Sequence, residues 1–561
     1  MENPFFIDIH THPEFKTYWS ANREVRRLNC WRKFRMPYLL RIIDLILLGD
    51  VLSSQCTLRQ LHRNRGLIAL AGLISAEKAE ITTNIHIRPG IEINLYKIAR
   101  ILKFLGYRKS IDPDLVQRIS LPVTYNFDLF KEVQEHLIRS ERRGCGYHLL
   151  TKISDYNPRK LNIILTIEGG HNLQTQTSGN NAGIDVVDNL RRLKLSGRRY
   201  FFMSMAHLEQ NLLCTHAYNI KIVTNDKFKP TVPENENGGL TTLGRDVITE
   251  ALKSQPYRML IDIKHMSLKA RQQYYDMLRQ NYRSENIPII MSHGGVTGVS
   301  WNNRLVATFP EVDHEWIKVQ HYKCPGLPGT KFYPRSINLY DEEIIKILDS
   351  KGVIGLNFDE KILGVKQIGQ AHPVEYFSKD DCSCSDFIVS STGYDGLQEP
   401  AERPSTFETR MDSLKEMLII YLNELYDHPG QYRAVEIRQR LNEIRQDYMQ
   451  LLTEMAQEGR PELIFNNAIK HLCNNILHIV KIGGQNAWKH ICIGSDFDGM
   501  INPINVCRNA KKYDNLSNAL KEWLLTMANN AAINYYITDI DKQVNDIMSG
   551  NAFKFLQDNF R

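Results

Sequence analysis

The sequence lacks the long apolar runs and the strong net charge that mark membrane-spanning and nucleic-acid-binding proteins. No stretch approaches the ~18 apolar residues that a membrane span needs, and no basic and apolar leader follows Met1. The chain carries 70 basic and 63 acidic residues, a formal net charge of +7. Nucleic-acid binding calls for a stronger, localised basic stripe. We therefore expect no membrane span, no nucleic-acid partner and a cytoplasmic location.

The sequence also lacks a cysteine framework. Its ten cysteines are scattered without a repeating spacing, which argues against a disulfide scaffold. Cys214 and Cys492 lie in apolar runs, where we expect buried, reduced thiols. Cys382 and Cys384 form a Cys-x-Cys pair in a polar loop, without a second pair at zinc-ribbon spacing. The remaining composition, 42% hydrophobic and 24% charged over 561 residues, is sufficient for a large buried core.

Short apolar runs recur along the chain and predict its fold. They are largely continuous, as expected of parallel strands buried on both faces. Eight such runs occupy residues 5–9, 67–74, 163–167, 200–206, 259–263, 287–291, 353–358 and 490–494. Amphipathic stretches such as 240–252 and 342–348 separate most of them. Eight strand-then-helix units predict an α/β fold, a closed (β/α)8 TIM-type barrel with helical insertions. A doubly wound open sheet is the alternative, but no glycine-rich fingerprint follows the first run.

The uneven spacing of the runs predicts two enlargements of this barrel. We assign residues 1–365 and 476–561 to the barrel, with an enlarged helical segment within 13–155. Residues 366–475 form an insertion, a polar loop followed by two helical segments around the turn at 428–430. Apolar residues at 4-3-4-3-4 spacing on the second segment fit a helix-packing seam. A helical hairpin packed on itself is expected, with a lid or a homodimer contact as the alternatives.

Histidines and acidic residues follow nearly every predicted strand. They are His10, His12, Glu168, His207, His265, His293 and Asp496. Active sites of barrels lie at the C-terminal ends of the strands. Side chains that are distant in the sequence should therefore converge there.

The residue types at these positions predict a metal centre. His10 and His12 are two apart, so in a strand they face the same way and can bind one ion. Imidazole and carboxylate ligands together suit zinc. A carboxylate such as Glu168 can bridge two ions, and a hydroxide between the ions is a strong nucleophile at neutral pH. A lone histidine is often a core residue whose ring nitrogens are hydrogen-bonded. Several histidines together at strand ends instead favour a site for two divalent metal ions, which we predict to be zinc.

The motifs resemble the membrane dipeptidase family of zinc peptidases (renal dipeptidase-like, peptidase family M19), within the amidohydrolase superfamily. The resembling segments are Ile167-Glu-Gly-Gly-His171, Gly239-Leu-Thr-Thr-Leu-Gly-Arg245, Asp262-Ile-Lys-His265, Ser292-His293, Gly494-Ser-Asp-Phe-Asp-Gly499 and Ser549-Gly-Asn-Ala-Phe553. All appear in the family's order, and the two enlargements fall outside them.

The resemblance implies a ligand set. It implies that His10 and His12 bind one ion, that Glu168 bridges both, and that His265 and His293 bind the second.

The resemblance also implies residues that act on the substrate. His207 would hold it and polarise the scissile carbonyl or stabilise the tetrahedral intermediate. Arg304 would meet the substrate carboxylate. Asp496 would orient the bridging water and transfer its proton. For Asp498 we expect a structural role, or a role in supporting the metal ligands.

Two departures from the family pattern bear on this site. The family usually has His-x-Asp where this chain has His10-Thr-His12, which removes one negative charge and bears on metal affinity and water pKa. Lys264 replaces a serine, and strand alternation predicts that it faces away from His265.

We therefore predict a binuclear metal-dependent hydrolase, a dipeptidase that cleaves the amide bond of small dipeptides through a metal-bridging hydroxide. An amidohydrolase-superfamily enzyme for another small amide, a lactone or a phosphoester is the alternative, favoured by the His-x-His departure. From a different class, a non-catalytic barrel used for protein binding is the third interpretation.

Overall fold

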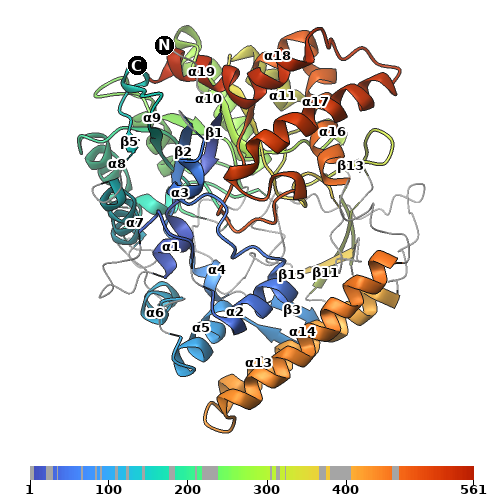
Figure 1. The fold of residues 1–561 in the computed structure, drawn as a ribbon. Helices are drawn as coiled ribbons and strands as arrows, with labels where there is room; N and C mark the ends of the chain where they lie inside the picture. The colour runs from blue at the N-terminus through green and yellow to red at the C-terminus, as the bar shows by residue number, and fades with distance from the viewer. Residues whose placement is uncertain are drawn as a thin grey trace.

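Eight parallel strands close into the predicted barrel (Figure 1). The computed structural model describes residues 6–20, 29–34, 36–64, 67–82, 85–88, 91–107, 111–121, 126–141, 146–175, 184–208, 211–217, 238–303, 306–310, 316–321, 324–365, 374–378, 406–457 and 467–561. The barrel strands are β1 (Ile7–Thr11), β2 (Ile68–Leu73), β6 (Leu161–Ile167), β7 (Tyr200–Ser204), β8 (Leu260–Asp262), β9 (Ile290–Gly294), β14 (Val353–Leu356) and β16 (Ile491–Ile493). Each overlaps one of the eight apolar runs, so the predicted (β/α)8 barrel is confirmed.

The ring follows the order of the chain. Each strand pairs in parallel with the next, β1 pairs with β16, and β2 pairs with β6 to close the circle. Every residue of these eight strands is buried. Continuous apolar runs suit such strands, because one face packs inside the barrel and the other packs under helices. A short strand, β5 (Tyr147–Leu149), pairs with β6 outside the ring.

Amphipathic helices cover the outside of the barrel. They are α8 (Val186–Lys194), α9 (Thr242–Leu252), α10 (Leu268–Asn281), α11 (Asp341–Asp349), α16 (Asn467–Gly483), α17 (Tyr513–Asn529), α18 (Ile540–Asn545) and α19 (Asn551–Asn559). Local sequence sets their starts: the Thr241 hydroxyl accepts a hydrogen bond from Gly244 N at 2.9 Å and so caps α9. The predicted stretches 240–252 and 342–348 correspond to α9 and α11.

The chain between β1 and β6 carries many short elements besides β2. They are α1 (Phe15–Trp19), α2 (Tyr38–Ile43), the π-helical turn η1 (Asp44–Leu48), α3 (Leu58–Leu61), α4 (Lys78–Thr82), the hairpin of β3 (Ile85–Arg88) and β4 (Ile91–Ile93), α5 (Leu95–Phe104), α6 (Pro113–Ser120) and α7 (Asn126–Glu141). Two small antiparallel sheets lie elsewhere: β10 (Val306–Pro310), β11 (Trp316–His321) and β15 (Val374–Ser378), and the pair β12 (Cys324–Pro325) and β13 (Lys331–Phe332).

Two long helices, α13 (Thr406–Asp427) and α14 (Ala434–Gln457), form a hairpin at the lower edge of the molecule in Figure 1. They pack together through Met411, Leu414 and Leu451. The hairpin also docks on the enlarged N-terminal segment, since Lys97 Nζ donates to Asn423 Oδ1 at 2.9 Å and Asn423 Nδ2 donates to Glu92 O at 2.9 Å. The helices therefore pack on each other and on the segment that follows β2.

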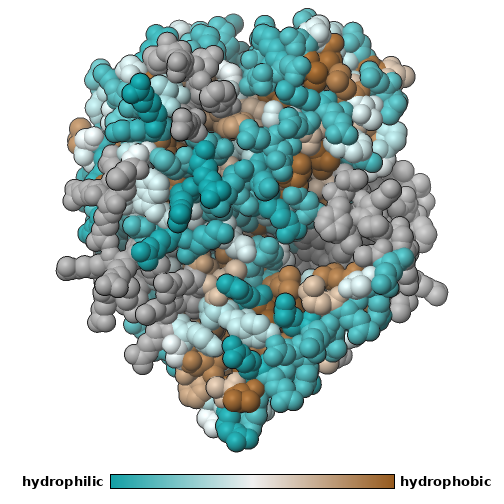
Figure 2. All heavy atoms as spheres, in the orientation of Figure 1, coloured by the Kyte–Doolittle hydropathy of each residue, from teal (hydrophilic) through white to brown (hydrophobic). Residues whose placement is uncertain are grey.

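The surface is mostly hydrophilic on the face drawn in Figure 2, with apolar patches beside the hairpin at the bottom of the view. Exposed apolar side chains of the hairpin are Met417, Ile420, Val435 and Met449. A homodimer contact there stays a prediction. Among the helices that the structure describes, none has the length and apolar character to cross a membrane.

The thiols of Cys214 and Cys492 are buried and free, as the sequence predicts. The Cys382-x-Cys384 pair and most of the polar loop at 371–405 lie outside the described residues.

Candidate metal centre

The side chains predicted at the strand ends converge around the carboxylate of Glu168. Glu168 directly follows β6 and is 3% exposed. Four histidine Nε2 atoms surround its two oxygens: those of His12 and His265 at 3.1 Å, and those of His10 and His293 at 3.4 Å. The barrel thus brings together one carboxylate and four imidazoles that lie far apart in the sequence.

The first histidine pair lies at the end of β1. The Nε2 atoms of His10 and His12 are 3.0 Å apart, so both rings turn to the same side. Gly72 on β2 leaves room for them, because a Cβ there would lie 2.9 Å from His10 Cε1 and 3.0 Å from His12 Cε1. Asp8 fixes the strand end, since its Oδ1 accepts from His10 N at 3.2 Å and from Ser495 N at 2.9 Å. Burial raises the pKa of Asp8 to about 6.

The second histidine pair follows β8 and ends β9. The His293 ring stacks on His10 with centroids 3.8 Å apart. Its Nδ1 lies 2.8 Å from Ser292 Oγ, and the same hydroxyl donates to Asp262. This chain of contacts aims His293 Nε2 at Glu168. His265 has a left-handed backbone, with φ of +67°, a conformation that non-glycine residues rarely adopt outside constrained sites.

The donor set fits divalent metal ions. Three combinations of ligand atoms lie within 4.8 Å of one another: His10, His12 and Glu168; His10, His293 and Asp496; and Glu168, His207 and His265. Burial lowers the pKa of His265 to about 3 and that of His293 well below its ordinary value. Neutral imidazoles keep the nitrogen lone pair that a metal ion needs.

The buried charge of Glu168 gives a second reason for this fit. A carboxylate that is 3% exposed needs a compensating positive charge. In the protein alone, neighbouring imidazoles supply it: burial opposes protonation of His12, but Glu168 and Asp496 outweigh burial and raise the His12 pKa well above its ordinary value. Divalent cations would supply the same compensation without protons.

Asp496 and His207 are the most accessible members of the cluster. Their side chains are 12% and 11% exposed, against at most 5% for Glu168 and the other four histidines. Asp496 Oδ1 lies 3.4 Å from His12 Nε2, and Asp496 Oδ2 accepts a hydrogen bond from Asn357 Nδ2 at 3.1 Å. These two side chains therefore face the open side of the cluster.

His207 lies between two carboxylates. Its Nδ1 is 2.7 Å from Glu77 Oε2, and its Nε2 is 3.9 Å from Glu168 Oε1. Burial lowers the pKa of His207, but these two carboxylates outweigh burial and raise it to about 9.

Lys264 lies beyond the strand on which its direction was predicted. Strand β8 ends at Asp262, so Lys264 and His265 lie in the turn that follows. The Lys264 side chain is 1% exposed. Burial lowers its pKa to about 8, although Asp496, Asp262 and Glu168 oppose this change. The Lys264 side chain is therefore buried, and its direction away from His265 stays a prediction.

Asp498 supports the loop that carries Asp496. Its carboxylate accepts from Gln55 N at 2.8 Å and Cys56 N at 2.9 Å and pairs with Lys16 Nζ at 2.9 Å. This agrees with a structural role. Arg304 lies outside the described residues, so its role in substrate binding stays a prediction.

Sequence reasoning missed Glu77 and Asn357, which contact His207 and Asp496. Both lie at or just after the end of a predicted strand. Glu77 comes three residues after the run at 67–74, and Asn357 is the penultimate residue of the run at 353–358. The strand-end rule applied to acidic and amide side chains would have included them.

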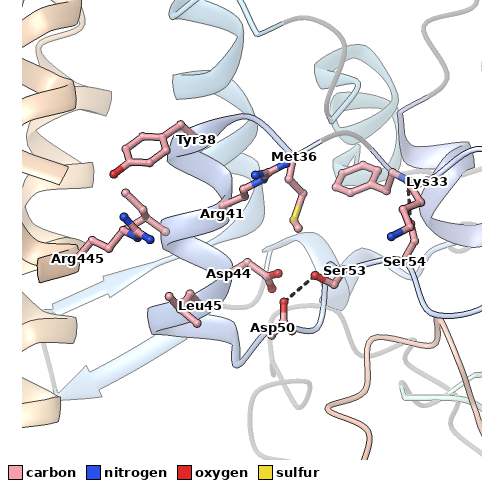
Figure 3. Close-up of a pocket in the computed structure, with 12 residues that line it drawn as sticks. Lys33, Met36, Tyr38, Arg41, Asp44, Leu45, Asp50, Ser53, Ser54 and Arg445 are labelled. Carbon is pink, nitrogen blue, oxygen red and sulfur yellow. Dashed lines mark hydrogen bonds between the residues drawn. The ribbon is translucent and has the colours of Figure 1, made fainter. Parts of the chain in front are cut away.

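A separate cavity of about 500 Å³ lies between the α2–η1 segment and α14 (Figure 3). Tyr38 and Arg445 stand at one end and Lys33 at the other, with Asp44 between them. Neither Glu168 nor any residue of the histidine cluster lines this cavity.

One family model matches part of this chain. Residues 330–534 match the family model of membrane dipeptidase (peptidase family M19). This range includes Asp496 but not the histidine cluster. The search of curated proteins found no match.

The solved structures that this chain matches include one probable dipeptidase and one dipeptidase. The probable dipeptidase PvdM from Pseudomonas aeruginosa is 14% identical, with 90% of this chain and 88% of that chain covered and a TM-score of 0.44. The dipeptidase AC of family M19 is 12% identical, with 100% and 99% covered and a TM-score of 0.45. A third is the metallopeptidase from Rhodobacter sphaeroides liganded with a phosphinate mimic of the dipeptide L-Ala-D-Ala. It is 12% identical, with 100% of both chains covered and a TM-score of 0.42.

The family match over residues 330–534 confirms that this chain resembles the membrane dipeptidases of peptidase family M19.

Proposed function

We propose that this protein is a binuclear zinc dipeptidase that cleaves the amide bond of small dipeptides. The observation that carries the proposal is the buried group of four histidine Nε2 atoms within 3.1–3.4 Å of one carboxylate. Imidazole and carboxylate ligands at the C-terminal mouth of a barrel suit a hydrolytic zinc centre. The family match supports peptide bonds as the substrate class.

The two histidine pairs suggest how two ions are divided. His10 and His12 would hold one ion, His265 and His293 the other, with Glu168 between them. When bound, the ions would supply Lewis-acid polarisation of the scissile carbonyl and lower the pKa of water.

The accessible side chains would act directly on the substrate. Asp496 would receive a proton from the attacking water and return it to the leaving nitrogen, because its carboxylate faces the open side and is oriented by Asn357. His207 would contact the carbonyl oxygen through Nε2. Arg304 would pair with the free carboxylate of the dipeptide.

The test is hydrolysis of a panel of L,L- and L,D-dipeptides by zinc-loaded protein, with Asp496→Asn as the matched variant. We expect two zinc ions per chain in both proteins by elemental analysis, and turnover by the wild type alone. The variant should lose about 10²–10⁴-fold in kcat, the usual contribution of a positioned acid–base group.

Two other results would redirect the proposal. A protein that holds two ions but cleaves no dipeptide is an amidohydrolase for another small amide, a lactone or a phosphoester. The extra imidazole of His12, 3.1 Å from Glu168, favours this second candidate. A protein without bound metal and without any turnover would support the binding-protein interpretation.

A further inference from the structure

Glu77 is a buried carboxylate beside the cluster that the ligand set does not use. It lies in the turn between β2 and α4 and is 4% exposed. Its Oε2 is 2.7 Å from His207 Nδ1 and accepts from Leu208 N at 3.0 Å. Both contacts reach the segment after β7, so Glu77 connects the loop that follows β2 to the loop that follows β7, two strands with β6 between them.

His171 lies on the other side of Glu77 and does not compete with His207 for it. Its Nε2 is 2.9 Å from Ser75 O, so that nitrogen carries the proton. Its Nδ1 is 3.4 Å from Glu77 Oε1. Burial is the main cause that lowers the pKa of His171. In this neutral form Nδ1 has no proton to donate, which leaves His207 as the histidine that donates to Glu77.

Gly169 allows this arrangement. Its φ is +89°, and a Cβ there would lie 2.4 Å from the His171 ring and 3.2 Å from His207 Cβ. A side chain at this position would push apart the two rings that flank Glu77. The backbone after β6 is thus shaped for the Glu77–His207 contact as well as for Glu168.

We propose that Glu77 is the positioning residue for His207: it holds the ring by Nδ1 so that Nε2 points at the substrate carbonyl oxygen. This inference rests on the proposed dipeptidase function. A carboxylate that accepts from one imidazole nitrogen fixes the ring plane and the proton position, and it stabilises positive charge on the ring when negative charge develops at the oxygen. The contribution of Glu77 is therefore made in the transition state more than in substrate binding.

The ionised state of Glu77 agrees with this role. Burial alone would raise its pKa, but His207 and His171 outweigh burial and lower the pKa to about 2. The carboxylate is charged at every pH at which a peptidase is assayed.

The test compares Glu77→Gln, His207→Gln and the double variant, each loaded with zinc. Glu77→Gln should lower kcat about 10–100-fold, the usual effect of removing such an outer partner, while KM stays within about threefold, because ground-state binding is retained. The double variant should be no slower than His207→Gln alone, since Glu77 acts only through that ring. The affinity for a phosphinate dipeptide mimic should fall in parallel with kcat.

Glu250→Gln is the matched control. Glu250 is a buried residue of α9, away from the cluster. Its carboxylate pairs with Arg191 of α8 and with Lys253, which directly follows α9. Its substitution should leave kcat, KM and zinc content unchanged. Equal losses in Glu250→Gln and Glu77→Gln, or additive losses in the Glu77–His207 double variant, would overturn the proposal.

A spectroscopic readout separates this proposal from the dipeptidase assignment. In protein labelled with ¹⁵N-histidine, Glu77→Gln should shift the ring-nitrogen resonances of His207, which the His207→Gln spectrum identifies by their loss. If the wild type cleaves no dipeptide but the resonances shift, the proposed function fails and the positioning role stands. Unchanged His207 resonances would refute the role of Glu77 whatever the activity.

Discussion

At the scale of single residues, the absence of a side chain matters as much as the ligands. Glycine is the residue type that fits at position 72, because a Cβ there would lie 2.9 Å from His10 Cε1 and 3.0 Å from His12 Cε1. We expect Gly72→Ala to tilt His10 and His12 and to reduce bound zinc from two ions toward one, with more than about tenfold loss of affinity. Elemental analysis after dialysis against a zinc buffer measures this.

Gly430→Ala is the control for Gly72→Ala, because no atom lies within 4 Å of a Cβ at Gly430. Its zinc content should equal that of the wild type. Full zinc occupancy in Gly72→Ala with an unchanged circular dichroism spectrum would show that the rings can move aside without cost to the site.

Asp44 makes stability depend on pH. It is 1% exposed, and its Oδ1 accepts from Leu52 N at 2.9 Å. Burial raises the pKa of Asp44 from 3.8 to about 7. The folded state therefore holds this proton more tightly than the unfolded state does. The resulting contribution of Asp44 to stability is fully present below pH 3.8 and is lost as the pH rises to about 7.

Asp44→Asn should remove this dependence on pH. The melting temperature of the variant relative to the wild type should rise between pH 5 and pH 8, equivalent to on the order of 2–4 kcal/mol. Differential scanning calorimetry at the two pH values measures it. If the melting temperatures of the variant and the wild type differ by the same amount at both pH values, Asp44 is already ionised in the folded protein at pH 5.

Strand periodicity predicts part of the site. The i, i+2 spacing correctly predicts that His10 and His12 face one way, although β1 ends at Thr11 between them. The direction predicted for Lys264 relative to His265 stays a prediction, because β8 ends at Asp262 and both residues lie beyond it. The left-handed backbones of His265 and Asp496, with φ of +67° and +62°, depend on tertiary contacts that no local pattern encodes.

At the scale of elements, the strands were predictable and the enlargements only partly so. Each apolar run overlaps a barrel strand, although β9 (Ile290–Gly294) begins three residues after the first residue of the run at 287–291 and extends three residues beyond its end. Strand β5 was not predicted, because its residues Tyr147, His148 and Leu149 do not form a continuous apolar run. The docking of the hairpin on α2 and α5 involves side chains such as Asn423 and Lys97, and their partners are distant in the sequence.

We propose that residues 366–475 are an insertion whose hairpin can loosen without disturbing the barrel. Leu451 is fully buried against Met411 and Leu414, so Leu451→Ala should cost about 2–5 kcal/mol of local stability. Hydrogen exchange should quicken in α13 and α14 and stay unchanged in the barrel strands, with dipeptidase activity retained.

Met449→Ala serves as the comparison on the same helix, since Met449 is 45% exposed. It should leave exchange in both helices unchanged. If Leu451→Ala quickens exchange equally in β1 and β16, the hairpin and the barrel unfold as one unit and the proposed division is wrong.

At the scale of the whole molecule, the site joins distant parts of the barrel. The five proposed ligands come from β1, β6, β8 and β9 and the turns that follow them. Ions that bind only the folded chain stabilise it by about 4 kcal/mol at a concentration 1,000-fold above Kd. Chelation should therefore lower the melting temperature, and zinc should restore it.

Magnesium is the control for this measurement. It prefers six oxygen ligands and binds imidazole poorly, so it should restore neither melting temperature nor activity. A melting temperature that does not change on chelation would indicate that the imidazole cluster is stable without ions, and would contradict the ligand assignment.

The pairing of β1 with β16 has a consequence for how the protein is made. A ribosome delivers His10 well before Asp496, and β1 cannot complete its ring until β16 emerges. Until then β1 and β14 each lack a neighbour on one side, and the cluster lacks Asp496. A nascent chain that has not yet reached β16 can therefore neither close its barrel nor assemble the whole cluster, so the site forms late relative to the synthesis of its first histidines.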